Sequence, residues 1–182
     1  MISIEAKNLE YARHLLANAP KGVRYAAINA INRTVTKMKT QVSKSIRKNY
    51  LVSAKDVKGT LSIKRATGAR IQGSVTSTGR SPLLTAFRVR VNKRGPVKVQ
   101  VRRGVSAKAV PGLFLGTSRS GYVGAMMRKK IHARYPLKIP YGPSVPKMFG
   151  SENVLAELTP MAEKTLNERF LHEVEYQFNK GK

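Results

Sequence analysis

The chain has 182 residues, and its 35 Lys or Arg against 9 Asp or Glu give a formal charge of +26 at pH 7. A charge of this size implies an anionic partner, which can be nucleic acid, an acidic protein or an anionic membrane. No Cys is present, which excludes a disulfide framework, a thiolate zinc site and a cysteine nucleophile.

The positive charge is concentrated in residues 57–151, which contain 20 Lys or Arg and no Asp or Glu. Because nothing within this stretch neutralises its cations, a compact fold repels itself unless negative charge comes from outside. We therefore treat residues 57–151 as the functional part of the sequence and the remainder as its scaffold.

Two helices are expected at the N-terminus, over residues 5–18 and 23–48. In the second, apolar residues recur at helical spacing from Val23 to Ile46. Four cations share the opposite side at 100° per residue: Arg33, Lys37, Lys44 and Lys48. This side is either a solvated surface or part of an anion-binding one.

A short helical turn through residue 58 is expected after Ser53, which with Asp56 has the form of a capping box. Alternating apolar residues then predict two strands around residues 67–69. The first strand holds Leu61 and Ile63, and the second holds Ile71, Gly73 and Val75.

A β-hairpin is predicted over residues 87–102, where valines alternate with mostly basic residues on either side of the loop 92–96. A symmetric register places Val91 opposite Val97 and Arg90 opposite Lys98. The valine face is expected to be buried. On the other face like charges lie opposite each other at a cost in stability, so this face either binds an anion or is simply solvated.

Residues 104–121 are rich in Gly, Ser and Ala, and are expected to form a long loop anchored by Leu113, Phe114 and Leu115. A strand is expected over residues 122–127, directly before a basic cluster at 128–130. Four prolines predict an extended, rigid segment over residues 134–148, with at most edge-strand pairing.

The C-terminal part is acidic, with six of the nine acids at or after Glu152. A helix is expected to begin at Thr159-Pro160, with the pairs Lys164–Glu168 and Arg169–Glu173 along it. Five residues at steps of four are expected to be buried: Ala162, Leu166, Phe170, Val174 and Phe178. This acidic helix is expected to face the basic body of its own subunit or of a neighbour.

Together these elements predict an α+β fold, in which an antiparallel β-sheet or small sandwich packs against the long N-terminal helix and a C-terminal helix follows. A single domain over residues 1–182 is expected. It comprises a helical part (1–50), a basic β-rich body (51–150) and an acidic helical part (151–182).

An enzymatic role is not expected. A metal-dependent nuclease needs converging carboxylates, and the basic midsection has none. His14, His132 and His172 lack the spacing of metal ligands. No stretch approaches the roughly 18 apolar residues of a membrane span. We therefore expect no catalytic residue, no metal, no cofactor and no membrane partner.

The candidate functional residues form two groups. Contacts with DNA or another polyanion, made to phosphates and hence indifferent to sequence, are expected from fourteen cations: Arg33, Lys37, Lys44, Lys48, Arg88, Arg90, Lys93, Arg94, Lys98, Arg102, Arg103, Arg128, Lys129 and Lys130. Contacts between subunits are expected from the apolar residues of the 104–121 loop and from the acidic helix: Leu113, Phe114, Leu115, Glu163, Glu168 and Glu175.

Several short motifs, taken in order, resemble the minor tail protein Z family of phages and prophages. Residues 27–34 (AINAINRT), 50–52 (YLV) and 56–58 (DVK) are similar to its N-terminal half. Residues 111–114 (PGLF), 134–137 (RYPL) and 141–146 (YGPSVP) are similar to its C-terminal half. Family members often have Ala-Leu-Asn where this chain has Ala30, Ile31 and Asn32. The resemblance covers residues from about 5 to 175.

The resemblance implies a structural virion protein that completes the tail or joins it to the head, at the head-proximal end of a non-contractile tail. It implies a ring-forming homo-oligomer, expected to be a hexamer, assembled in the host cytoplasm. The implied partners are tail tube or terminator, tape measure and neck proteins, and genomic DNA through its phosphates. The alternative, from charge and size alone, is a basic RNA-binding or ribosome-associated protein.

Overall fold

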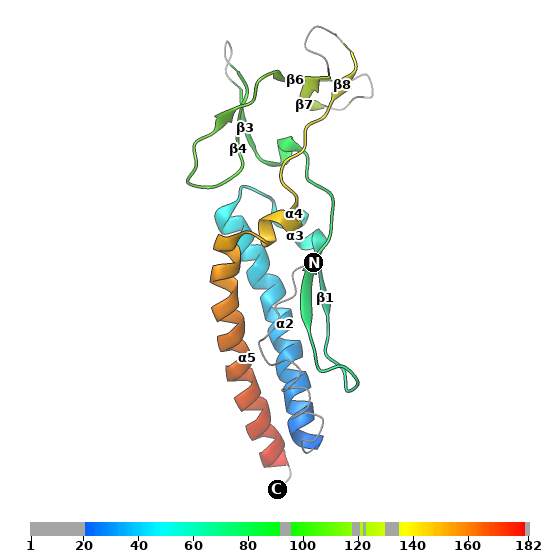
Figure 1. The fold of residues 1–182 in the computed structure, drawn as a ribbon, viewed down its shortest axis with the longest axis vertical. Helices are drawn as coiled ribbons and strands as arrows, with labels where there is room; N and C mark the ends of the chain where they lie inside the picture. Colours follow the sequence, from blue (N-terminus) through cyan, green and yellow to red (C-terminus); the bar gives the residue numbers. More distant parts are fainter. Residues whose placement is uncertain (1–20, 92–95, 118–120, 122, 130–134, 181–182) are drawn as a thin grey trace. The chain divides into compact units, whose positions relative to one another are not determined.

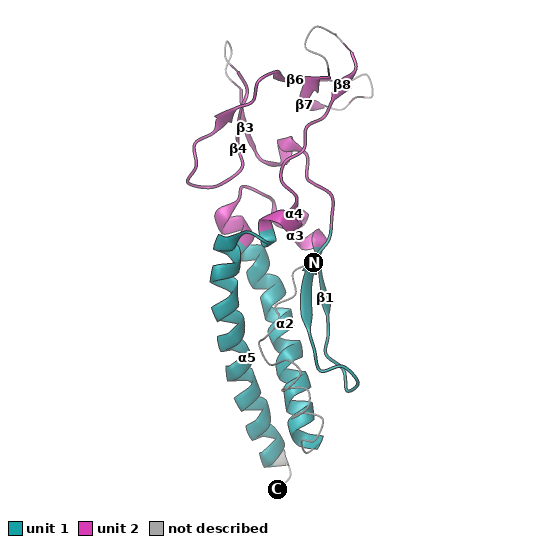
Figure 2. Cartoon of the chain, viewed as in Figure 1, with its two compact units in different colours: residues 1–45, 61–78, 149–182 teal, residues 46–60, 79–148 magenta. Residues whose placement is uncertain are grey.

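The computed structural model describes residues 21–91, 96–117, 121, 123–129 and 135–180 (Figure 1). The helix predicted over residues 5–18 and most of the hairpin loop 92–96 lie outside these residues. The chain forms two compact units (Figure 2): unit 1 comprises residues 1–45, 61–78 and 149–182, and unit 2 comprises residues 46–60 and 79–148. The expectation of a single domain over residues 1–182 stays a prediction.

The long N-terminal helix is confirmed as α2 (Lys21–Asn49). Its side chains divide as the sequence predicts, with an apolar stripe turned inward and the four cations exposed. Six residues of the stripe are buried: Ala27, Ala30, Val35, Met38, Val42 and Ile46. Because burial of such a stripe, more than helix propensity, holds a helix in a protein, this stripe fixes the orientation of α2.

A two-stranded sheet packs on α2 within unit 1. Strand β1 (Leu61–Lys64) pairs antiparallel with β2 (Ser74–Ser77), which begins later than predicted, so that Ile71 and Gly73 precede it. A Cβ on Gly73 would lie 2.6 Å from Val35 Cγ2 and 2.7 Å from Ile31 Cγ2, so only glycine allows this close approach. The Asn32 side chain donates to Ala66 O (3.1 Å) and accepts from Ala66 N (2.8 Å), which ties the turn to the helix.

Helix α5 (Glu152–Lys180) corrects the predicted start of the C-terminal helix. Pro160 lies inside α5 and not at its first turn, because the helix begins earlier, where the backbone N–H groups of Val154 and Leu155 donate to Ser151 O at 3.0 Å. Val154 and Leu158 are buried in these first turns. Their packing compensates for the hydrogen bond that Pro160 cannot donate.

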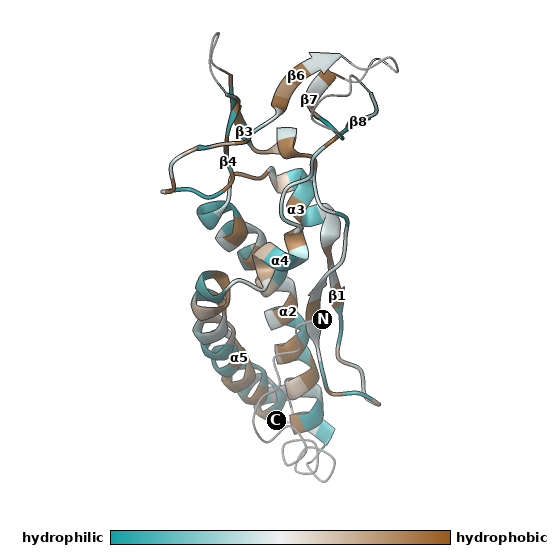
Figure 3. Ribbon diagram, turned by 45° about the horizontal axis from the view of Figure 1, so that its top comes forward, coloured by the Kyte–Doolittle hydropathy of each residue, from teal (hydrophilic) through white to brown (hydrophobic). Residues whose placement is uncertain are grey.

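The predicted buried face of α5 is also wrong in part. Leu166 and Phe178 are exposed, whereas Thr165 and Glu173 are buried. Figure 3 shows apolar and polar residues intermixed along the helix, so its apolar pattern alone does not identify the inner face. The inner face is selected instead by polar partners on α2.

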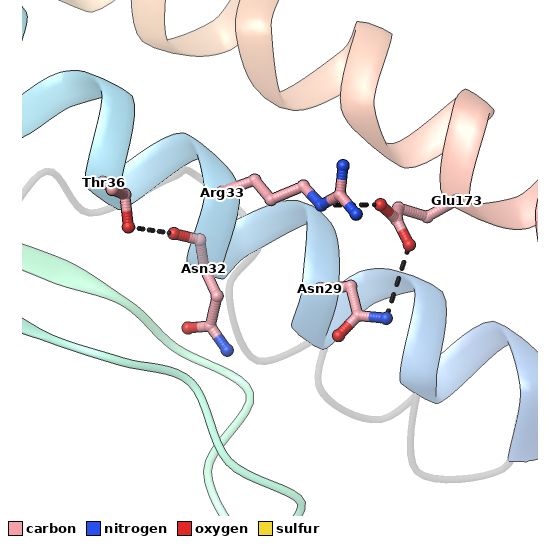
Figure 4. Close-up of polar contacts among 5 residues, drawn as sticks. All are labelled: Asn29, Asn32, Arg33, Thr36 and Glu173. Carbon is pink, nitrogen blue, oxygen red and sulfur yellow. Dashed lines mark hydrogen bonds and ion pairs between the residues drawn. The ribbon is translucent and has the colours of Figure 1, made fainter.

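Those polar partners make α2 and α5 antiparallel neighbours. Ser45 Oγ donates to Glu157 Oε2 at 2.7 Å near one end. Near the other end, Asn29 Nδ2 donates to Glu173 Oε2 at 3.3 Å and Arg33 Nε lies 3.0 Å from Glu173 Oε1 (Figure 4). Glu173 therefore pairs across the helices with Arg33, and not with Arg169 as predicted. The exposed pair Lys164–Glu168 is confirmed at 4.0 Å.

Unit 2 contains the last turn of α2 and then α3 (Ala54–Thr60), where Ser53 is confirmed as the N-cap: Asp56 N donates to Ser53 Oγ at 3.1 Å. Asp56 Oδ2 accepts from the Ser53 hydroxyl at 2.7 Å, whereas in a capping box it would accept from the Ser53 backbone N–H. A 3-10 turn, η1 (Leu84–Ala86), follows. Two three-stranded antiparallel sheets complete the unit. One contains β3 (Arg88–Arg90), β4 (Lys98–Gln100) and β5 (Lys108–Ala109), and the other β6 (Leu113–Thr117), β7 (Val123–Arg128) and β8 (Leu137–Lys138).

The predicted α+β class is confirmed, with the strands divided among three small antiparallel sheets. The predicted hairpin register is also confirmed, since Arg90 pairs with Lys98 and Val89 with Val99. Its valine face is buried only in part: Val97 and Val99 are buried, but Val91 is 54% exposed.

Residues 104–121 are not a long loop. They contain β5 and β6, and β6 pairs along its whole length with β7, from Leu113–Met127 to Thr117–Val123. The Gly, Ser and Ala content concealed this pairing, which depends on the partner strand. The proline segment forms the predicted edge strand β8, but its end is the helix α4 (Val145–Phe149), where Pro146 lies in the first turn and needs no N–H donor.

Replacing Arg33 with Gln should destabilise the protein by about 1–3 kcal/mol, because the buried carboxylate of Glu173 loses its charged partner. Replacing Lys164 with Gln is the matched control. It removes a cation from an exposed pair, so its cost should stay below about 0.5 kcal/mol. Urea denaturation of both variants measures the difference, and equal costs would contradict a buried pair.

Replacing Gly142 with Ala should cost about 1–3 kcal/mol, because a Cβ there would overlap Cε2 of the buried Phe87 ring. The control is Gly68→Ala, because no atom of the described residues lies within 4 Å of a Cβ added there. Thermal unfolding compares the two. A Gly142→Ala protein as stable as the control would show that the ring moves aside freely.

Candidate polyanion-binding surface

Positive charge is divided unequally between the two units. Unit 2 contains 20 Lys or Arg and one acid, Asp56, whereas unit 1 contains 15 Lys or Arg and eight Glu. The single acid of unit 2 accepts a hydrogen bond from the Ser53 hydroxyl at the N-terminus of α3. Nearly all charged side chains of unit 2 are therefore cations, so its surface attracts negatively charged partners.

The hairpin presents the densest cationic face whose geometry is defined. Arg88 and Arg90 lie two residues apart on β3, so both point to the same side, and the register places Lys98 beside Arg90 on that side. All three are exposed. Within the described residues none of them has an acidic partner: Arg88 stands opposite the neutral Gln100, and Arg90 stands opposite another cation, Lys98.

The end of α2 adds a second group of cations, held by the segment that follows β4. Tyr50 forms a β-bridge with Arg102, and Leu51 N donates to Val101 O at 2.9 Å. Arg103 Nε donates to the carbonyl of Arg47 at 2.9 Å, and Arg103 N donates to Asn49 O at 2.9 Å. These bonds satisfy carbonyls that a helix end leaves open, and a guanidinium suits the negative end of the helix dipole.

Arg102 is positioned by an aromatic ring. Its guanidinium carbon lies 5.5 Å from the centroid of Tyr50, a cation–π contact, and Tyr50 itself is buried. The strand alternation continues from Lys98 through Gln100 to Arg102. Arg102 therefore extends the cationic face of the hairpin toward the end of α2.

The predicted contact residues outside this surface have varied surroundings. Lys37, Lys44 and Lys48 are exposed on α2, but Arg33 is paired with Glu173 and so carries a compensated charge. Arg128 and Lys129 are exposed at the end of β7, in the other sheet of unit 2. Lys93, Arg94 and Lys130 lie outside the described residues.

The predicted subunit-contact residues are divided between the two units. Leu113 is buried and Phe114 half-buried, whereas Leu115 is 46% exposed. Glu163, Glu168 and Glu175 are all exposed on α5, which belongs to the other unit. The structure thus places the apolar and the acidic groups in different units.

Two features of the surface were missed from the sequence. Arg47 precedes Lys48 directly, but it falls outside the stripe that singled out the other cations of the helix. The Tyr50–Arg102 contact joins residues 52 positions apart, and only the bridge between the two segments reveals it. In the segment that follows β4, the adjacent basic residues Arg102 and Arg103 were the one feature of the sequence that pointed to this part of the surface.

This arrangement of exposed cations is suited to binding a chain of negative charges. Among the described residues no group of His, Cys, Asp or Glu is arranged to hold a metal ion. None of the described helices is both long and apolar enough to cross a membrane. In complexes with nucleic acids, Arg and Lys side chains contact phosphates without reading bases.

The family model described as prophage minor tail protein Z (GPZ) matches residues 7–180. The chain belongs to this family. No curated protein and no solved structure matches it.

Membership in the minor tail protein Z family makes the chain a structural component of the phage tail, and therefore of the virion. It favours interaction with other tail proteins and a structural rather than an enzymatic role. The resemblance seen in the short sequence motifs is thereby confirmed over nearly the whole chain.

Proposed function

We propose that this minor tail protein completes the tail at its head-proximal end, where copies of the chain form a ring, and that unit 2 contacts the phosphates of the genome. The observation that carries the proposal is the charge of unit 2, with 20 cations against one acid. A tail protein with such a unit needs a polyanion beside it, and packaged DNA is the polyanion that a tail meets.

The hairpin and the end of α2 are the parts of unit 2 assigned to this contact. Arg88, Arg90 and Lys98 are exposed and have no acidic partner among the described residues, and Arg102 continues their face. Neutralising phosphates with these side chains relieves their mutual repulsion and releases counterions from DNA, which makes such binding strongly dependent on salt. The contact is indifferent to sequence, as a protein that meets any genome end requires.

Changing Arg88, Arg90 and Lys98 together to Gln should weaken binding to duplex DNA without unfolding the protein. The slope of log K against log salt should fall by up to about 2.7, since each lost phosphate contact removes about 0.9. Fluorescence anisotropy across a salt series measures it. A matched control changes Lys21, Lys64 and Arg65, three exposed cations of unit 1, to Gln. An equal loss in the control would assign binding to net charge alone.

Phage particles test the tail-completion role directly. In a phage deprived of this chain, electron microscopy should show filled heads and separate tails, and supplying the wild-type chain should restore joined, infectious particles. Supplying the Arg88, Arg90 and Lys98 triple variant should restore joining but give fewer infectious particles. Normal particles formed without any copy of the chain would refute the proposal.

A further inference from the structure

We propose that the outer side of α5 is a subunit-contact surface that docks on the exposed lysines of α2 in a second copy of the chain. The inference rests on the proposed function only in requiring that copies associate. It names the two surfaces that meet, both of which belong to unit 1.

The outer strip of α5 consists of Glu168, Leu171, Glu175 and Phe178. Steps of three, four and three residues keep these four within about 80° of one another, at 100° per residue. They lie about 140–200° around the helix from Glu173, which faces α2. Leu171 is 63% exposed between the two glutamates, and Phe178 is 70% exposed one turn beyond Glu175.

Among the described residues, the two glutamates of this strip have a single basic partner between them. Glu168 has only the exposed Lys164, at 4.0 Å, a type of pair that contributes little. Glu175 has no basic partner among the described residues. A surface that joins two carboxylates with two apolar side chains fits a partner that offers cations on alkyl stems, which is what lysine supplies.

Helix α2 offers such lysines at the matching spacing. Lys37 and Lys44 are exposed and seven residues apart, as Glu168 and Glu175 are, so both pairs repeat at about 10.5 Å along their helices. Thr40 stands between the lysines where Leu171 stands between the glutamates, and neither lysine has an acidic partner among the described residues. The match works for either direction of the two helices.

The cations of the hairpin do not offer this spacing. Residues on the same side of a strand repeat at about 6.6–6.8 Å, so Arg88 and Arg90 are too close together for the two glutamates. Helix α2 is therefore a better partner than the hairpin for the strip on α5, and the hairpin remains available to bind a polyanion. When the two strips meet head to tail from copy to copy, the contact is heterologous, the kind that generates a ring when the rotation closes.

Sedimentation velocity of the full chain tests this with reciprocal charge reversal. Glu168→Lys with Glu175→Lys, or Lys37→Glu with Lys44→Glu, should each weaken self-association about tenfold or more, as two attractions become repulsions. Combining all four changes in one chain should restore it to within about threefold of wild type. Circular dichroism confirms that each variant is folded.

The control is Glu152→Lys with Glu163→Lys, which changes the charge of α5 equally but lies about 140° and 120° around the helix from Glu175. It should leave association within about twofold of wild type, which also excludes Glu163 from the contact. A wild-type chain that stays monomeric, a control as weak as the strip variants, or a four-residue variant that fails to recover would each overturn the inference. In the last two cases self-association and the DNA binding of unit 2 still stand, so the proposed function is tested separately.

Discussion

The structure depends on a separation of charge along one chain. Unit 2 contains 20 Lys or Arg and a single acid, and that acid is bound in the cap of α3. Its cations therefore have no internal counter-charge, and like charges even stand opposite each other at Arg90 and Lys98. A unit of this kind is at its lowest free energy only beside negative charge from elsewhere, because self-repulsion otherwise opposes its compact state.

Four glutamates of α5 in unit 1 fall into two groups, one that faces α2 and one that is exposed on the outer side of the helix. Glu157 and Glu173 point to α2 and set the register of the two long helices through Ser45, Asn29 and Arg33. Glu168 and Glu175 point outward beside Leu171 and Phe178. A buried carboxylate with a cationic partner specifies one helix face, whereas an exposed carboxylate beside apolar side chains remains available to another chain.

These two properties agree with membership in a family of phage tail proteins. The proposed function gives the chain contacts with neighbouring copies and a position beside the genome. The proposed division of labour gives association to the helices of unit 1 and the polyanion to the strands of unit 2. The spacing of charges supports that division, since helical repeats of about 10.5 Å match other helices, while strand repeats of about 6.8 Å group cations closely.

The sequence by itself determined the α2 helix, the N-cap at Ser53, the register of the hairpin and the family, because each of these depends on neighbouring residues or on a strong local period. Only the tertiary structure decided the rest. Strand β6 (LFLGT) lies in a segment rich in Gly, Ser and Ala that reads as a loop, and it is a strand because β7 pairs with it along its whole length. Helix α5 continues through Pro160 because buried residues hold its first turns. Its inner face is the one with Glu173, since Arg33 and Asn29, 140 or more residues away, supply the partners that no period in the sequence records.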